Sequence, residues 1–229
     1  MKLNNPILAL ACDYDETLAC NGQINPSTVE ALVRLKASGK KIVLVTGREL
    51  DELLQVCPEI KLFDLVVAEN GAVLFSPETG QSRALAGRPP EGLLKALRQR
   101  GVQPLSTGQC IMATVLKHYA VVLETIAEMK LDREVILNRS SVMVLPAGVH
   151  KGTGLKLALE ELNVPLENVV GIGDAENDDA FLSLCGSYVA VGNAIPSIQE
   201  AADVVTDLDH GAGVTQVIES VLAGEFSRN

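Results

Sequence analysis

Short runs of consecutive apolar residues alternate with amphipathic segments in the first third of the chain. Ile7–Cys12 is continuously apolar, as expected for a strand that is covered on both faces. Pro26–Ser38 then carries apolar residues at helical spacing and is a predicted helix. Ile42–Thr46 and Leu65–Ala68 are the next predicted strands, with a predicted helix at Glu49–Val56 between them. This β-α-β-α-β order predicts a parallel sheet with helices on both faces.

The same alternation returns in the last third of the chain. Thr153–Leu162 has the pattern of a helix, and Asn168–Ile172 is an apolar run that predicts a strand. The remaining predicted elements, in chain order, are a helix at Asp178–Leu184, a strand at Tyr188–Val191, a helix at Pro196–Ala201, a strand at Val204–Thr206 and a helix at Val214–Ala223. We therefore assign residues 1–80 and 150–229 to one α/β core, a Rossmann-like doubly wound parallel sheet.

Residues 81–149 break this alternation. The predicted elements there are a helix at Glu91–Arg100, strands at Val102–Leu105 and Cys110–Leu116, a helix at His118–Lys130, and strands at Glu134–Asn138 and Val142–Leu145. The order αββαββ is typical of a small antiparallel sheet with two helices on one face. We expect residues 81–149 to form a small α+β domain inserted into the core.

Composition and charge narrow the classes of function. The chain of 229 residues has a formal net charge of −10 and no Trp. Because this field repels phosphate backbones and no indole can stack on bases, the sequence argues against a nucleic-acid partner. The five cysteines contain no CxxC pair, which indicates neither a disulfide framework nor a zinc site and favours a reducing, cytoplasmic location. Ile7–Cys12 is too short for a signal peptide, and no run approaches the roughly 20 apolar residues of a membrane span.

Two groups of candidate residues follow predicted core strands in the first third of the chain. Asp13 and Asp15 come directly after the first strand, and carboxylates at this spacing can face one crevice, one as nucleophile or metal ligand and the other as acid or base. An isolated pair of this kind is equally compatible with a solvated turn. Thr46, Gly47 and Arg48 close the second strand. A hydroxyl, a small residue and a guanidinium suit a phosphate, although a Thr that caps an ordinary helix gives the same pattern.

Two further groups lie in the last third. Lys151 stands where the inserted segment rejoins the core, and it is either a positive charge for a phosphate or an ordinary surface lysine. In Gly171–Asp179, acidic residues follow a predicted strand. Gathering Asp174 and Asp178 beside the first acidic pair would be repulsive without a cation, and oxygen ligands without Cys or His indicate Mg²⁺. The segment begins like a dinucleotide fingerprint, but Glu176 replaces the third glycine, so we reject that interpretation.

The motif order D-x-D-x-T, T-G-R, K-G and G-D-x-x-N-D resembles the haloacid dehalogenase superfamily of phosphohydrolases, over both halves of the core. An αββαββ insertion between the second and third motifs is similar to the type-2 cap of the Cof-like branch. The chain length and short cap are most similar to its archaeal-type phosphoglycolate phosphatases. Asn70-Gly71 matches the family's NGA element, whereas Glu16 stands where the family usually has glycine.

The resemblance implies a role for each matching residue. Asp13 would be the nucleophile that forms an aspartyl-phosphate, and Asp15 the general acid and then the general base. Mg²⁺ would be bound by Asp13, the backbone carbonyl of Asp15 and Asp174, with Asp178 as a further ligand or directly behind the ligands. Thr46 and Lys151 would bind the transferring phosphoryl group, and Asn177 would orient Lys151 or the substrate. Gly47 and Arg48 belong to the same expected set of substrate- and phosphate-binding residues.

The expected function is Mg²⁺-dependent hydrolysis of a small phosphorylated metabolite: phosphoglycolate by resemblance, with a hexose or sucrose phosphate as the alternative. Two other classes stay open, a phosphotransferase or mutase and a noncatalytic binding protein on the same fold. The cap position argues against a mutase, and the presence of Asp15 argues against a noncatalytic protein. We expect the cap to set specificity through polar residues such as Lys117, His118, Asn138 and Arg139.

Overall fold

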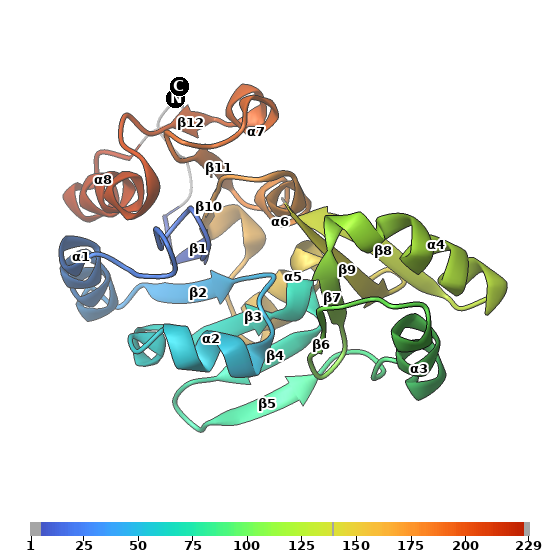
Figure 1. Cartoon of the computed structure of the whole chain (residues 1–229). Helices are drawn as coiled ribbons and strands as arrows, with labels where there is room; N and C mark the ends of the chain where they lie inside the picture. The colour runs from blue at the N-terminus through green and yellow to red at the C-terminus, as the bar shows by residue number, and fades with distance from the viewer. Residues whose placement is uncertain (1–5, 139, 227–229) are drawn as a thin grey trace.

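The computed structural model describes residues 6–138 and 140–226 (Figure 1). Within these residues, eight strands form a large sheet in the order β12-β11-β10-β1-β2-β3-β4-β5. Neighbouring strands from β12 to β3 are parallel, and β4 and β5 add an antiparallel edge. The strands are β1 (Ala9–Asp13), β2 (Lys41–Val45), β3 (Leu65–Ala68), β4 (Val73–Ser76), β5 (Gln81–Ala84), β10 (Val169–Gly173), β11 (Ser187–Ala190) and β12 (Val204–Val205).

The helices of the core connect these strands. They are α1 (Pro26–Ala37), α2 (Leu50–Val56), α5 (Lys151–Leu162), α6 (Asp179–Leu182), α7 (Pro196–Ala201) and α8 (His210–Ala223), with short 3-10 turns η1 (Ile60–Leu62), η2 (Glu69–Gly71), η4 (Leu166–Asn168) and η5 (Glu176–Asp178). All five residues of β1 are buried, as are all five of β10, because helices cover both faces of the sheet. The prediction of a doubly wound α/β core is confirmed.

The start of α1 shows how local sequence fixes an element of the core. The Asn25 side chain accepts a hydrogen bond from the backbone N–H of Thr28 at 2.8 Å, and Pro26 occupies the first turn, where no N–H is needed. The Thr28 hydroxyl then donates to the carbonyl oxygen of Gly211 in α8 at 2.7 Å. These contacts join the first and last helices of the core, which lie side by side in Figure 1.

A second, small sheet is built from β6 (Leu105–Thr107), β7 (Met112–Val115), β8 (Arg133–Asn138) and β9 (Ser141–Pro146), in the order β6-β7-β9-β8 and wholly antiparallel. Val142 and Val144 pack against α3 (Glu91–Gln99) and α4 (Tyr119–Glu128), whereas Met143 joins the hydrophobic core of the large sheet. This alternation follows from the two-residue period of a strand. The chain order of these elements agrees with the expected αββαββ pattern; η3 (Leu116–His118) precedes α4.

Most predicted boundaries shift by one or two residues, and the three largest differences are in β5, β6 and α8. Gln81–Ala84, expected in the inserted segment, forms β5 and pairs with β4 in the large sheet. All four of its residues are exposed, so no apolar run marked it as a strand. β6 starts at Leu105 rather than Val102, because Pro104 has no N–H for a strand ladder. α8 begins at His210 rather than Val214, in a stretch whose glycines carry no apolar pattern.

None of the helices in the described part of the chain is both long and apolar enough to cross a bilayer.

Candidate active site

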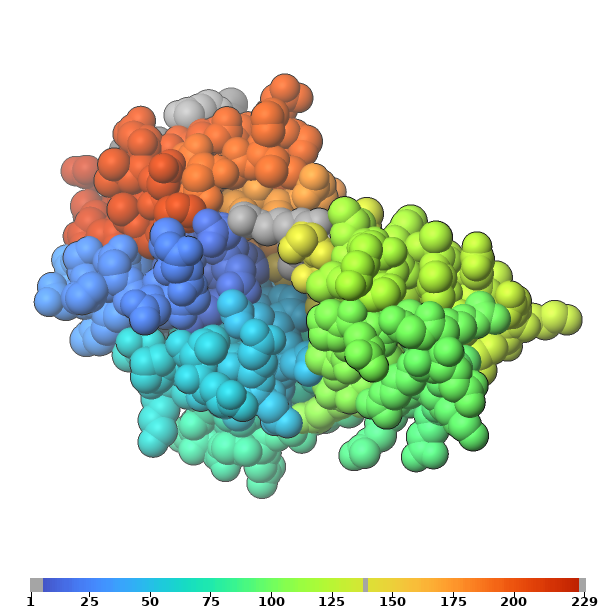
Figure 2. All heavy atoms as spheres, in the orientation of Figure 1, coloured from blue at the N-terminus to red at the C-terminus, as the bar shows by residue number. Residues whose placement is uncertain are grey.

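The predicted site residues converge at one edge of the large sheet. β1 lies between β10 and β2 and is parallel to both, so the carboxyl ends of the three strands meet at the same edge. Asp13 is the last residue of β1, Thr46 follows β2, and Asp174 follows β10. The small sheet stands beside this edge (Figures 1 and 2).

Three buried carboxylates form an acidic cluster there, Asp13, Asp174 and Asp178. One carboxylate oxygen from each lies within 4.8 Å of the others. The Lys151 ammonium, at the first residue of α5, donates to Asp13 Oδ1 at 2.5 Å and to Asp178 Oδ1 at 2.6 Å. None of these four side chains is appreciably exposed. The sequence predicted this group, and the structure places it in one contact network.

Burial and the neighbouring charges together set the protonation of this network. Burial, together with repulsion from Asp178, raises the pKa of Asp13 well above its ordinary value, against the opposing effect of Lys151. Burial also lowers the pKa of Lys151, but attraction to the two carboxylates outweighs it and the net pKa is raised. Lys151 is therefore charged at neutral pH, and the four side chains hold three carboxylates against one ammonium. This oxygen-only, negatively charged set fits a hard divalent cation.

Backbone and hydroxyl groups fix the orientation of the acidic cluster. Asp178 Oδ2 accepts from the N–H groups of Asp174 and Ala175 at 2.9 and 3.0 Å. The Thr17 hydroxyl donates to Asp174 Oδ1 at 2.8 Å. A Cβ atom at Gly173 would lie 2.8 Å from the Asp178 side chain, so the glycine permits this close approach. The last residue of D-x-D-x-T thus positions a carboxylate that lies far along the chain.

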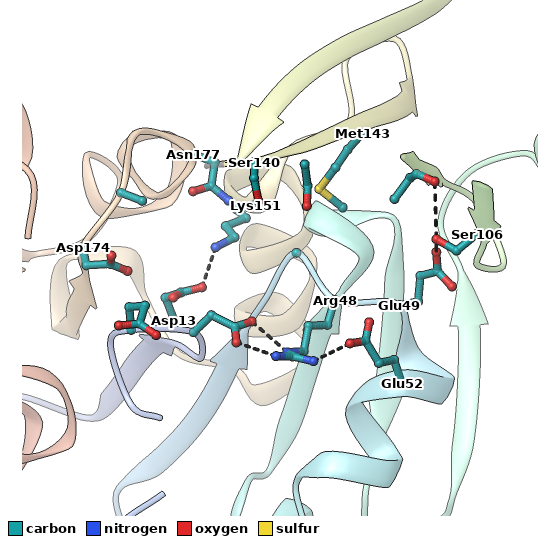
Figure 3. A pocket seen from close by; sticks show the side chains of 16 residues that line it. Asp13, Arg48, Glu49, Glu52, Ser106, Ser140, Met143, Lys151, Asp174 and Asn177 are labelled. Atoms are coloured by element: carbon teal, nitrogen blue, oxygen red, sulfur yellow. Dashed lines mark hydrogen bonds and ion pairs between the residues drawn. The ribbon is translucent and has the colours of Figure 1, made fainter. Parts of the chain in front are cut away.

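Asp15 and Arg48 form a second polar group at the pocket wall. Arg48 donates through Nε and Nη2 to the two carboxylate oxygens of Asp15, at 2.8 and 2.7 Å, and through Nη1 to Glu52 at 2.5 Å. Its guanidinium carbon also lies 5.7 Å from the centre of the Tyr14 ring. Arg48 was predicted to bind phosphate; in the structure its guanidinium is held between two carboxylates (Figure 3).

These groups line a pocket of about 310 Å³ between the core and the small sheet. The volume is at the lower end for small-molecule sites, so the pocket suits a compact ligand. The core contributes Asp13, Asp15, Glu16, Gly47, Arg48, Glu49, Glu52, Lys151, Asp174, Ala175 and Asn177, and the small sheet with its hairpin contributes Ser106, Ala113, Ser140, Ser141 and Met143. Among these lining residues six are acidic and two are cationic. An anionic ligand therefore requires an additional positive charge.

Most of the predicted residues reach this pocket, but some do not. Thr46 and Asp178 are buried and do not line it; the Thr46 hydroxyl accepts from the N–H of Arg48 at 3.1 Å. Lys117 and His118 were expected to contact substrate and are not among the described lining residues. The His118 ring is paired with the backbone of Gln103. Arg139 and the side chain of Asn138 lie outside the described part of the structure.

The Asn70-Gly71 element connects the two sides of the pocket. Asn70 donates to Met143 Sδ of the small sheet at 3.0 Å and accepts from Asn177 at 3.3 Å. Gly71 has φ +100°, and a Cβ atom there would lie 2.1 Å from the carbonyl oxygen of His150. Only glycine permits this approach, which brings η2 against the start of the helix that carries Lys151.

Two contacts between the core and the small sheet were missed by the sequence reasoning. The fully buried Glu69 carboxylate accepts from the N–H groups of Gln109, Cys110 and Ile111, at 2.8, 2.8 and 3.2 Å. Glu49 accepts from the Ser106 hydroxyl at 2.6 Å (Figure 3). Neither glutamate stands in a pattern that distinguishes it from a solvated acidic residue.

The fold and the site define a class of protein. The family model for haloacid dehalogenase-like hydrolases matches residues 10–108 and 111–218, so the chain belongs to this family and is a hydrolase, as its motifs predicted.

Curated relatives are similar along nearly their whole length. The chain is 29% identical to phosphoglycolate phosphatase 2 of Saccharolobus solfataricus, with 100% of this chain and 98% of the relative covered. It is 34% identical to phosphoglycolate phosphatase of Sulfurisphaera tokodaii, with 92% of each covered. A haloacid dehalogenase-like hydrolase from Bacteroides thetaiotaomicron has a similar structure, with TM-score 0.82, 20% identity and coverage of 93% and 98%. At that identity the structural likeness shows the fold alone.

Proposed function

We propose that this chain is a Mg²⁺-dependent phosphatase that hydrolyses a small phosphomonoester through an aspartyl-phosphate on Asp13. The observation that carries the proposal is the contact of the Asp13 carboxylate with Lys151 at the base of a small pocket. A nucleophile at the end of a central strand is held rigidly, and an adjacent ammonium offers positive charge to a phosphoryl group. The phosphatase names of the curated relatives support the same class.

The proposed chemistry has two displacements at phosphorus. In the first, an Asp13 carboxylate oxygen attacks, the ester oxygen leaves, and Asp15 gives it a proton. In the second, Asp15 takes a proton from water, which attacks the aspartyl-phosphate and releases inorganic phosphate and free Asp13. Arg48, through its two bonds to Asp15, is proposed to hold this carboxylate toward the pocket.

Because many carboxylates line the pocket, a negatively charged phosphoryl group needs positive charges and hydrogen-bond donors to bind there. We assign Lys151, the Thr46 hydroxyl, Gly47 and Asn177 to this binding. Because Thr46 is buried behind the pocket wall, its hydroxyl has to turn from Arg48 toward the pocket to reach the phosphoryl group.

The acidic cluster is proposed to hold Mg²⁺. The ligands would be the carboxylates of Asp13 and Asp174 and the backbone carbonyl of Asp15. Both oxygens of Asp178 already accept hydrogen bonds, so Asp178 serves either as a further ligand or to position Lys151 and Asp174. When bound, the ion supplies positive charge that neutralises the phosphoryl group.

For the substrate we propose phosphoglycolate, because the curated relatives carry that name and the pocket is small. A sugar phosphate is the second candidate. Hydroxyl groups of Ser106, Ser140 and Ser141 line the opposite side of the pocket and match the hydrogen bonding of sugar hydroxyls. In both cases the elements from α3 to β9 are proposed to act as a cap that contacts the leaving group.

Release of inorganic phosphate tests this function. Phosphoglycolate and hexose phosphates are compared with Mg²⁺ for the wild type, Asp13→Asn and Asp132→Asn, an exposed aspartate in the cap. We expect Asp13→Asn to lose at least about a hundredfold in kcat/KM, because an amide cannot form the acyl phosphate. Asp132→Asn should match the wild type. Asp13→Asn with near-normal turnover would contradict the nucleophile, and phosphoryl transfer to a sugar without free phosphate would identify a phosphotransferase.

A further inference from the structure

Three side chains of different metal-binding chemistry meet on the surface beside the pocket: Glu16, Cys20 and His210. One carboxylate oxygen, the thiol sulfur and one ring nitrogen all lie within 4.8 Å of one another. Glu16 and His210 are half-buried, and Cys20 is exposed, so an ion in solution can reach them. The group joins the loop after β1 to the start of α8. It shares no residue with the acidic cluster, which consists of aspartates alone.

Hydrogen bonds hold the backbone of all three residues in place. The Glu16 N–H donates to the Ala19 carbonyl at 2.8 Å, and Cys20 exchanges two backbone bonds with Gln23, at 3.0 and 3.1 Å. The Asn193 side chain donates to the Glu16 carbonyl at 2.8 Å and accepts from the His210 N–H at 2.7 Å. The loop and the helix start that carry the three side chains are thus held in place by hydrogen bonds. A site arranged before the ion arrives loses less conformational freedom on binding.

The same contacts orient the histidine ring. His210 Nδ1 lies 2.9 Å from the Glu16 carbonyl oxygen. The same nitrogen lies 3.7 Å from Glu16 Oε2. A carbonyl oxygen only accepts, so Nδ1 carries the proton in this contact, and Nε2 is the ring nitrogen with a lone pair for an ion. A backbone carbonyl on the second ring nitrogen is the usual way in which a metal-binding histidine is held in one tautomer.

We propose that Glu16, Cys20 and His210 form a binding site for a borderline-soft divalent ion, with Zn²⁺ as the cation that fits best. Thiolate, imidazole and carboxylate are the three ligand types of Zn²⁺, and Mg²⁺ does not favour sulfur or nitrogen. Binding releases one proton from the Cys20 thiol, and the thiolate and carboxylate together balance the charge of the ion. Three protein ligands leave the fourth tetrahedral position to water or another small ligand.

The site would also connect to the loop that carries Asp15. Glu16 directly follows Asp15 and has φ +61°, a left-handed conformation that is unfavourable in a residue other than glycine. An ion held between Glu16 and His210 ties this strained loop to α8. The proposal concerns binding and stands whether or not the chain is a phosphatase.

Cobalt titration of the reduced protein in excess Mg²⁺ tests the site. Excess Mg²⁺ is present to compete with Co²⁺ for the acidic cluster, and only a thiolate ligand gives the near-ultraviolet sulfur-to-Co²⁺ charge-transfer band. We expect the band to saturate at one equivalent and to disappear when Zn²⁺ is added. Bound Zn²⁺ should also slow alkylation of Cys20 by iodoacetamide, which is read by mass spectrometry on the unaltered chain. A wild-type protein without the band and without protection of Cys20 overturns the proposal.

Matched variants assign the ligands. Cys20→Ser should abolish the band, and His210→Gln and Glu16→Gln should each weaken Co²⁺ binding by tenfold or more. Cys185→Ser and His118→Gln alter a thiol and an imidazole elsewhere and should bind as the wild type. A band that survives Cys20→Ser, or an affinity that is unchanged in His210→Gln, contradicts this set of ligands. Circular dichroism confirms that each variant is folded before titration.

Discussion

The Lys151 ammonium lies between the buried carboxylates of Asp13 and Asp178, and its positive charge partly compensates their negative charge. Its distances to Asp13 and Asp178 are those of short, charge-assisted hydrogen bonds. Burial alone would lower its pKa, so its protonated state depends on these two partners. The folded-state pKa is raised above the ordinary 10.5. The stabilisation is therefore complete at neutral pH and is lost only as the pH rises above that value.

Replacing Lys151 with methionine should destabilise the metal-free protein by about 3–5 kcal/mol, because two buried carboxylates lose their common cation. Urea denaturation at pH 7.5 measures the change. Lys156→Met, in an exposed position of the same helix, should alter the free energy of unfolding by less than about 0.5 kcal/mol. Equal effects of the two substitutions would show that the buried ion pairs do not matter for stability.

At the scale of elements, the short η2 turn joins the two sheets. Asn70 contacts Met143, Gly71 packs against the start of α5, and Glu69 binds three backbone N–H groups at residues 109–111. Glu69 and Asn70 have positive φ, at 54° and 53°. These conformations are costly, and the contacts that follow from them offset the cost. The turn therefore fixes the position of the small sheet relative to the large sheet at the pocket.

Glu69→Gln should loosen this junction. Glutamine keeps one carbonyl oxygen as an acceptor, but its NH2 group replaces the other carboxylate oxygen and faces at least one of the three N–H groups, so we expect a loss of about 1–3 kcal/mol in the free energy of unfolding. Hydrogen exchange within residues 109–111 should quicken at the N–H that loses its acceptor. The exposed Glu78→Gln serves as the control. Unchanged exchange at residues 109–111 in Glu69→Gln would contradict this role.

At the scale of the whole molecule, two sheets enclose a pocket in which negative charge is concentrated. Six of the 29 acidic residues line the pocket, in a chain whose net charge is −10. Folding without a cation therefore brings like charges together, and an ion that binds only the folded state stabilises it. Binding of the proposed Mg²⁺ would therefore be coupled to folding.

Magnesium should raise the melting temperature, and more so at pH 8 than at pH 5. The pKa of Asp13 is raised above its ordinary 3.8, so the folded metal-free state holds this proton more tightly than the unfolded state. In chelator, the contribution of Asp13 to stability is therefore greatest below its ordinary pKa and is lost as the pH rises through the raised pKa. Magnesium compensates for that loss. Differential scanning calorimetry with EDTA or Mg²⁺ measures the shift, and an identical gain at both pH values would contradict the coupling.

The local pattern of apolar and polar residues determined most of the strands and helices of this protein. The buried run before Asp13 and the apolar run before Asp174 specify central strands, because only strands covered on both faces tolerate such continuous apolar sequence. Parallel strands end at one edge, so the positions of Asp13, Thr46 and Asp174 at strand ends predicted their meeting. The order of elements in the inserted segment followed in the same way from periodicity.

Only the tertiary structure determines the elements and contacts that the pattern of apolar and polar residues does not predict. β5 is exposed on every residue and exists only because β4 offers it a partner edge. Glu69 is an acceptor for a distant loop, and Arg48 pairs with Asp15 and Glu52, since the fold rather than the sequence sets the distances between such charges. No sequence pattern indicates the group formed by Glu16, Cys20 and His210, because its members come from segments that meet only in the folded chain. Side-chain chemistry is encoded residue by residue, but proximity between distant residues is a property of the folded chain.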